Sequence, residues 1–132
     1  MTIERLNPFS FGSFGYYSQG VKIDLGTKTM IITAGQIALN DEGKPVAPGD
    51  FTKQTEFIFG RIQQVLEAAG ATIDDVVKAQ FFITDVSKYS EVSAVRNEHF
   101  ANARPATTMM EISNTVADGC DVEIEVMAVI DN

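Results

Sequence analysis

Two carboxylates near the C-terminus have a spacing at which a β-strand would present both of them to one reactant. Glu123 and Glu125 alternate with apolar residues in the segment Val-Glu-Ile-Glu-Val at residues 122–126. In a strand, both side chains project from the same face, roughly 7 Å apart. Two acids on one face suit general acid–base catalysis if burial raises the pKa of one of them. The pattern alone favours a simpler arrangement, in which both carboxylates face solvent at the edge of a sheet.

Few other side chains in the sequence offer strong chemistry. Tyr17 could donate a hydrogen bond to a substrate while its ring covers the ligand, although an ordinary core or rim tyrosine fits equally well. Ser93 and Thr107 carry hydroxyls without an adjacent base, which argues against a serine or threonine nucleophile. His99 lies near the expected end of a helix, where a surface role is expected. Cys120 is expected to be an inert small residue near a turn.

Composition excludes several classes of function. With one histidine and one cysteine, the sequence predicts no metal site, and the absence of a glycine-rich phosphate motif predicts no nucleotide cofactor. A formal net charge of −8, with ten dispersed Lys and Arg residues, argues against partners such as nucleic acids or anionic membranes. No apolar run is long enough to span a membrane and no export signal is visible, so we expect a cytosolic protein.

The elements that must position these residues follow from changes in the hydrophobic period along the chain. Apolar residues at helical spacing between Asp50 and Gly70 predict one amphipathic helix that is capped by the glycine. A second helix is expected to begin near Asp85 or Ser87 and to end before Pro105. Strand-like segments cover residues 21–24, 30–34, 76–83, 107–112 and 121–130.

This order of elements predicts a single α+β domain over residues 1–132, with a mixed sheet and both helices on one face. Residues 1–15 are expected to form an N-terminal arm, in which the aromatic and small residues at 9–15 would suit a lid or a simple extension. The last strand is apolar on both sides, because Met127 and Val129 extend the second side. Since helices meet only one face of the sheet, we expect self-association to bury the other. The first side comprises Val122, Ile124, Val126, Ala128 and Ile130.

Five short segments, in the right order, resemble motifs of the Rid (YjgF-like) family of enamine/imine deaminases. They are residues 16–21 (like P-Y-S-Q-A-V), 33–37 (like S-G-Q-I), 63–78 (like L-x-A-A-G-x-x-x-x-D-V-V-K), 82–85 (like F-L-T-D) and 103–126, where a P-A-R-S/T strand precedes a V/I-E-I-E-A strand. The resemblance implies a homotrimer of chorismate-mutase-like architecture with three clefts between subunits. It also implies that small reactive enamines and imines are hydrolysed to carbonyl compounds and ammonium without a cofactor.

The resemblance also implies roles for individual residues. Tyr17 stands at the position of the cleft tyrosine, Gly35 at that of a backbone-binding glycine, and Glu123 at that of the water-orienting glutamate. We therefore expect Glu123 and Tyr17 to be catalytic and Gly35 to bind substrate. Three further positions depart from the family pattern: Ser93 replaces an asparagine, Met109 a cysteine and Thr107 the substrate-binding arginine.

Thr107 changes the expected substrate. Arginine binds a carboxylate through a planar pair of donors that a threonine hydroxyl does not reproduce. A buried carboxylate without that partner would lose about 2–5 kcal/mol of binding free energy. Arg104 could compensate, but three extended residues span about 10 Å, so its guanidinium reaches the position only if the chain bends at Pro105.

The sequence therefore predicts a divergent Rid-like hydrolase of a small imine, enamine or related metabolite, with weak activity on ordinary α-imino acids. Ser93, Met109 and Arg104 are expected to line the substrate-binding part of the cleft together with Thr107. The alternative is a non-catalytic small-ligand-binding or regulatory trimer.

Overall fold

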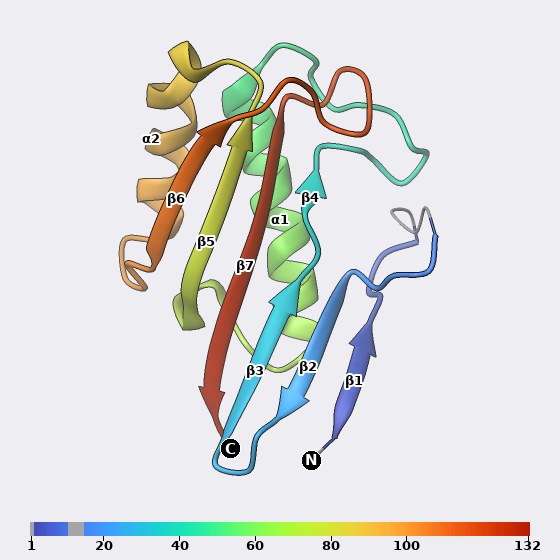
Figure 1. Cartoon of the computed structure of the whole chain (residues 1–132), viewed down its shortest axis with the longest axis vertical. Helices are drawn as coiled ribbons and strands as arrows, with labels where there is room; N and C mark the ends of the chain where they lie inside the picture. The colour runs from blue at the N-terminus through green and yellow to red at the C-terminus, as the bar shows by residue number, and fades with distance from the viewer. Residues whose placement is uncertain (1, 11–14) are drawn as a thin grey trace.

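One mixed β-sheet carries the structure, and two helices cover one of its faces (Figure 1). The computed structural model describes residues 2–10 and 15–132. The strands follow the order β1-β2-β3-β7-β5-β6, with β4 paired to β7; β5 and β6 run parallel and the other pairs antiparallel. The strands are β1 (Ile3–Leu6), β2 (Gly20–Asp24), β3 (Lys28–Thr33), β4 (Gln36–Ile37), β5 (Val76–Ile83), β6 (Ala106–Glu111) and β7 (Val122–Asp131).

The longer helix, α1 (Phe51–Ala68), begins and ends where the sequence predicts. The carboxylate of Asp50 accepts a hydrogen bond from the Lys53 amide at 2.9 Å, which satisfies a free donor of the first turn. Gly70 follows the last turn with φ +84°, a left-handed conformation that glycine adopts without strain. The apolar stripe predicted from the sequence, which includes Ile58, Ile62, Val65 and Leu66, is buried against the sheet.

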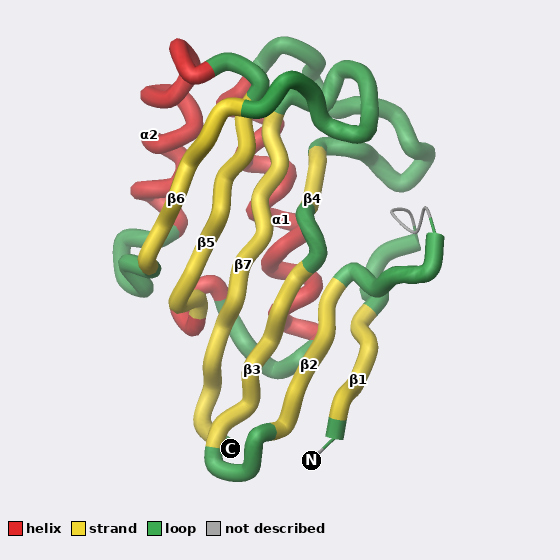
Figure 2. Tube along the Cα trace, in the orientation of Figure 1, coloured by secondary structure: helices red, strands yellow, loops and turns green. Residues whose placement is uncertain are grey.

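The second helix, α2 (Tyr89–His99), begins after a short 3-10 turn, Val86–Lys88. Asp85 caps that turn by accepting a hydrogen bond from the Ser87 amide at 2.9 Å. Both helices lie on the same side of the sheet, which leaves the other side as an open face of strands (Figure 2). The prediction of a mixed sheet with both helices on one face is confirmed.

Strand β7 lies at the centre of the sheet and divides its side chains between the two faces. The even-numbered residues Val122, Ile124, Val126 and Ala128 are buried under the helices. The odd-numbered residues Glu123, Glu125 and Met127 therefore project from the open face. This alternation places both carboxylates on the same side, as their spacing predicts.

Two strands are absent from the sequence-based expectation. β1 lies within the segment expected to be an arm and pairs with β2, and β4 consists of only two residues. Phe9, also from that segment, packs against the core. The middle of the aromatic segment at 9–15, residues 11–14, lies outside the described residues. Within the described part of the chain, no helix has the length and apolar character needed to cross a membrane.

Candidate functional site

A small cavity of about 70 Å³ lies where β4 joins β7 and the N-terminal segment passes beside them. Ile37 of β4 pairs with Glu123 of β7, which brings the glutamate to the cavity wall. Tyr17 and Gly35 line the same cavity. The structure thus brings together the three residues to which the sequence resemblance assigns the family's cleft roles. The complete lining is Phe9, Tyr17, Gln19, Gly35, Gln36, Ile37, Leu39, Arg61, Val116 and Glu123.

The cavity depends on a break in strand pairing between β3 and β4. At this break the Val126 amide donates a hydrogen bond to the hydroxyl of Thr33 at 3.0 Å, so the buried donor keeps a partner. Gly35 then passes directly over Glu123: a Cβ added at Gly35 would lie 2.9 Å from the carboxyl carbon and closer still to Oε2. Any larger residue at 35 would push the carboxylate out of place. The glycine therefore permits the observed position of the carboxylate through close approach, rather than through its backbone angles.

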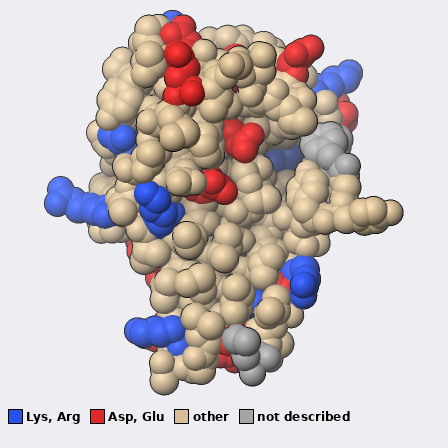
Figure 3. Space-filling model, viewed as in Figure 1, with Lys and Arg blue, Asp and Glu red and all other residues tan. Residues whose placement is uncertain are grey.

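Glu123 is half-buried, and this environment changes its acidity. Burial raises the pKa of its carboxyl group above the ordinary value, and the negative charge of Glu125 raises it further. Acidic side chains are visible at the centre of the open face in Figure 3. A carboxyl group with a raised pKa is a better proton acceptor when ionised than an exposed glutamate. Both glutamates are half-buried, so the fully solvent-facing arrangement favoured by pattern alone is not found.

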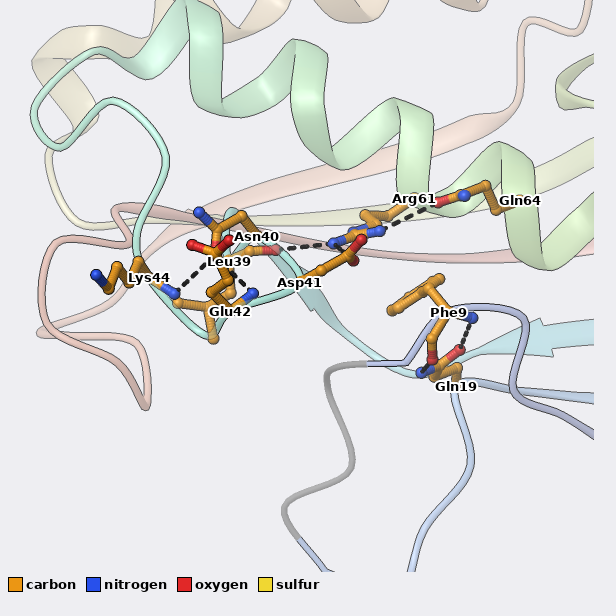
Figure 4. Close-up of polar contacts among 9 residues, drawn as sticks. All are labelled: Phe9, Gln19, Leu39, Asn40, Asp41, Glu42, Lys44, Arg61 and Gln64. Atoms are coloured by element: carbon orange, nitrogen blue, oxygen red, sulfur yellow. Dashed lines mark hydrogen bonds and ion pairs between the residues drawn. The ribbon is translucent and has the colours of Figure 1, made fainter.

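The N-terminal wall of the cavity is held by Gln19, whose side chain is buried. Its amide nitrogen donates to the carbonyl of Phe9 at 2.8 Å, and its amide oxygen accepts from the Phe9 N–H at 3.2 Å (Figure 4). The Gln19 N–H donates to Oδ1 of Asn7 at 3.1 Å. These bonds tie together two segments ten or more residues apart.

Arg61 of α1 is a residue of the cavity wall that the sequence analysis missed. Its guanidinium donates to Asp41 at 2.8 Å and to the carbonyl of Leu39 at 3.3 Å (Figure 4). It lies 4.4 Å from the ring centroid of Phe9 and 4.8 Å from that of Phe57. Arg61 therefore joins helix, loop and N-terminal segment around the cavity. The sequence contains one indication of this role: Arg61 is a charged residue close to the apolar stripe of α1.

Thr107 and Arg104 lie elsewhere, in a larger surface pocket of about 580 Å³ between α2 and the start of β6. Ser93 is buried in α2, where its hydroxyl donates to the carbonyl of Ser90 at 3.3 Å. Met109 packs against the core from β6. Of the four residues expected to line the substrate-binding part of the cleft, a single chain therefore places two in this pocket and two in the helix and core.

The sheet register separates Thr107 from Glu123. Thr107 pairs with Ala79, and Ala79 pairs with Val126. Two strand spacings sideways and three residues along β7 put the Cα atoms of Thr107 and Glu123 about 14 Å apart. Glu123 also projects from the opposite face to Val126. A small ligand therefore does not touch both residues of the same chain.

The remaining reactive side chains have structural contacts. The ring of His99 stacks on Phe59 with centroids 4.4 Å apart, and its Nε2 lies 3.0 Å from a carboxylate oxygen of Glu56. Cys120 is buried, and this burial, together with the charge of Asp121, raises the pKa of its thiol, which disfavours the reactive thiolate. Among residues 2–10 and 15–132, no cluster of His, Cys, Asp and Glu could hold a metal ion.

A mixed sheet covered by two helices, with Glu123 packed against Gly35, defines a small α+β protein with a candidate acid–base cavity. The chain belongs to the Rid (YjgF/RutC) family, whose family model, described as "Endoribonuclease L-PSP", matches residues 9–130. It is 36% identical over 120 residues to the 2-iminobutanoate/2-iminopropanoate deaminase of Escherichia coli K12, covering 89% of each chain. It is 32% identical over 114 residues to a RutC family protein of Pyrococcus abyssi, covering 86% of each.

Solved structures agree with this assignment. The crystal structure of the Rid family protein YyfA from Yersinia pestis superimposes with a TM-score of 0.85 at 32% sequence identity. The match covers 98% of this chain and 100% of that one. The family predicted from the sequence motifs is therefore confirmed, and its members include imine deaminases.

Proposed function

We propose that this protein hydrolyses a small imine or enamine to a carbonyl compound and ammonium, in a cleft between the subunits of a homotrimer. The observation that carries the proposal is Glu123, a half-buried carboxylate whose pKa is raised, placed beside Gly35 in a cavity that Tyr17 also lines. The similarity to a 2-iminobutanoate/2-iminopropanoate deaminase supports the reaction class. The single, buried cysteine is in keeping with a cytosolic site of action.

The proposed chemistry uses one water molecule and no cofactor. An enamine first takes a proton from the solvent on its carbon and becomes an iminium ion. Glu123, in its ionised form, accepts a proton from water as the water oxygen bonds to the iminium carbon. The protonated Glu123 then gives this proton to the nitrogen of the resulting carbinolamine. As the C–N bond breaks, the carbinolamine oxygen becomes the carbonyl of the product and its hydroxyl proton passes to the departing ammonia, which leaves as ammonium.

Other groups in the cavity would orient the reactant. The phenol of Tyr17 donates a hydrogen bond to the substrate, and the main chain at Gly35 binds it without a side chain in the way. The gap of about 14 Å between Thr107 and Glu123 requires a second copy of the chain if both groups contact one substrate. The open sheet face, where Ile32 and Met127 are exposed to 37% and 38%, offers an apolar surface for that assembly.

Turnover of imines generated in solution tests this proposal. With an amino-acid oxidase producing 2-iminobutanoate in situ, we expect slow hydrolysis by the natural protein, because Thr107 provides no guanidinium for the carboxylate. Thr107→Arg should raise kcat/KM roughly 30-fold or more. Glu123→Gln should abolish turnover of any substrate that the natural protein hydrolyses. Rapid hydrolysis of 2-iminobutanoate by the unaltered protein would contradict the role given to Thr107.

A non-catalytic ligand-binding trimer is the second candidate, and Thr107 is the observation that favours it. Loss of the arginine could reflect loss of catalysis rather than a change of substrate. A native ligand that stays unchanged after prolonged incubation with the protein would support this candidate. A net charge of −8 argues against the ribonuclease activity that the family description names, because RNA binding requires basic surface.

A further inference from the structure

The pocket beside Thr107 contains two arginines and no acidic side chain. Arg96 comes from the second half of α2, and Arg104 comes from the loop that connects α2 to β6. The uncharged polar groups of Tyr89, Asn97 and Thr107 complete its polar lining. No ion pair found in the described part of the chain involves either arginine. The pocket therefore has two positive charges that no neighbouring carboxylate neutralises.

Neutral contacts orient Arg96 without compensating its charge. The Nε–H donates to Oδ1 of Asn97 at 3.1 Å, and Nη1 donates to the hydroxyl of Tyr89 at 3.4 Å. The guanidinium carbon lies 5.6 Å from the centroid of the Tyr89 ring. Since a guanidinium has five N–H donors, several remain for a ligand.

A bend before Pro105 brings Arg104 to the same pocket. The sequence alone does not decide whether the chain bends there. The φ angle of Arg104 is +47°, in the left-handed region, and its N–H donates to the carbonyl of Phe100 at 3.0 Å. This conformation turns the chain sharply between the end of α2 and β6, so Arg104 and Thr107 line one pocket. The extended geometry that would hold Arg104 about 10 Å from position 107 is not found.

The charge distribution of the molecule makes this pocket unusual. The protein has a formal net charge of −8, so most of its surface repels anions. Figure 3 shows Lys and Arg side chains along the left margin, where α2 and β6 lie, and also at the right and lower margins, whereas acidic side chains occupy the centre and top of the same view. Two unneutralised guanidiniums in a pocket of about 580 Å³ select for carboxylate or phosphate groups, because both accept paired N–H donors.

We propose that Arg96 and Arg104 bind the anionic group, a carboxylate or phosphate, of a small ligand, with Asn97 and Thr107 as additional hydrogen-bonding groups. This inference rests on the proposed function in one respect: it identifies that ligand as the substrate of the Glu123 cavity on a neighbouring copy. The substrate would then be an imine or enamine whose anionic group lies farther from the reacting carbon than the carboxylate of an α-imino acid does. The threonine at 107 leaves room for the longer molecule.

Direct binding of two probes tests the site without any assay of turnover. Inorganic phosphate and succinate are titrated separately into the natural protein, and the amide shifts of Asn97 and Thr107 are followed by NMR. At least one probe should bind with saturable shifts at these residues, and the tighter of the two identifies the anionic group. Arg96→Gln and Arg104→Gln should each weaken that binding roughly tenfold or more. The matched control is Arg5→Gln, which removes one positive charge from an exposed position on β1. It should leave the affinity for the probe nearly unchanged.

The outcomes separate this inference from the proposed function. Glu123→Gln should leave binding of the probe intact, because Glu123 does not line the arginine pocket. Arg96→Lys and Arg104→Lys keep the charge and should bind with intermediate affinity, which distinguishes loss of the planar donors from misfolding. If neither probe binds, or if Arg5→Gln weakens binding as much as the pocket variants do, the anion site is wrong. Binding at the pocket without any imine turnover would leave the site standing and remove only its connection to catalysis.

Discussion

The proton of Glu123 gives the clearest test at the scale of single residues. Because the folded-state pKa of this acid is raised above 4.5, the folded protein binds more protons than the unfolded chain in the window between the two values. Stability is therefore lost as pH rises from about 4.5 through the raised pKa, since the ionised carboxylate is disfavoured in the folded state. Glu123→Gln removes this loss. Its melting temperature, relative to that of the natural protein, should be higher at pH 7 than at pH 4.

Glu125 provides the matched control for this prediction. Its charge is the second cause of the raised pKa, after burial. Glu125→Gln lowers the folded-state pKa of Glu123, so the fall in stability should end at a lower pH and be smaller, without disappearing. Thermal melts of both variants from pH 3.5 to 8 measure the difference. If Glu123→Gln raised the melting temperature equally at pH 4 and pH 7, the carboxyl group of Glu123 would not cause the pH dependence of stability.

The residues of the site differ in how well the sequence predicts them. Tyr17, Gly35 and Glu123 occupy motif positions, and they share one cavity in the structure. Arg61 has no local motif, because its partners Asp41 and Phe9 are 20 and 52 positions away in the sequence. Contacts at such separations depend on the folded topology, which a local pattern does not contain. The spacing of Glu123 and Glu125 likewise predicts that they lie on one face of the strand, but it does not predict how deeply they are buried.

At the scale of secondary-structure elements, a glycine within α1 and a glycine just after its end lead to opposite predictions. Gly70 has φ +84°, so Gly70→Ala should destabilise the protein by about 1 kcal/mol. Gly60 lies within the helix, is exposed, and has no neighbouring atom within 4 Å of an added Cβ. Gly60→Ala should therefore stabilise the protein by about 0.5–1 kcal/mol. Urea denaturation measures both free energies of unfolding. A loss of stability in Gly60→Ala would show that its exposed face is covered in the assembled protein.

Helices and long strands could be predicted because their apolar period extends over several turns or residue pairs. The 18 residues of α1 and the eight of β5 have that length. β4, with two residues, is too short for any period and exists because Gln36 and Ile37 pair with β7. β1 has a single buried residue, Leu6, so its alternation is invisible in the sequence. Elements that depend on pairing rather than on their own pattern are the ones that sequence reasoning misses.

At the scale of the whole molecule, the two faces of β7 have different consequences for mutation. Val126 and Ala128 are buried under the helices, so a charge at either position should unfold the chain. Met127 projects from the open face and is exposed to 38% in a single chain. Together with Ile32 it belongs to the apolar surface that we assign to self-association. Charged substitutions on this face distinguish loss of assembly from loss of folding.

We expect the natural protein to sediment as a trimer, about three times 14.4 kDa. Met127→Lys should convert it to a folded monomer, because a buried, unpaired ammonium disfavours the interface while the helix-side core is untouched. Leu25→Lys, the same type of change in the β2–β3 turn with 52% exposure, is the control and should stay trimeric. Analytical ultracentrifugation with circular dichroism separates the outcomes. Imine turnover should disappear with the trimer, because Thr107 and Glu123 of one chain are about 14 Å apart and face opposite sides. A natural protein that is monomeric at micromolar concentration would contradict both the interface and the cleft between subunits.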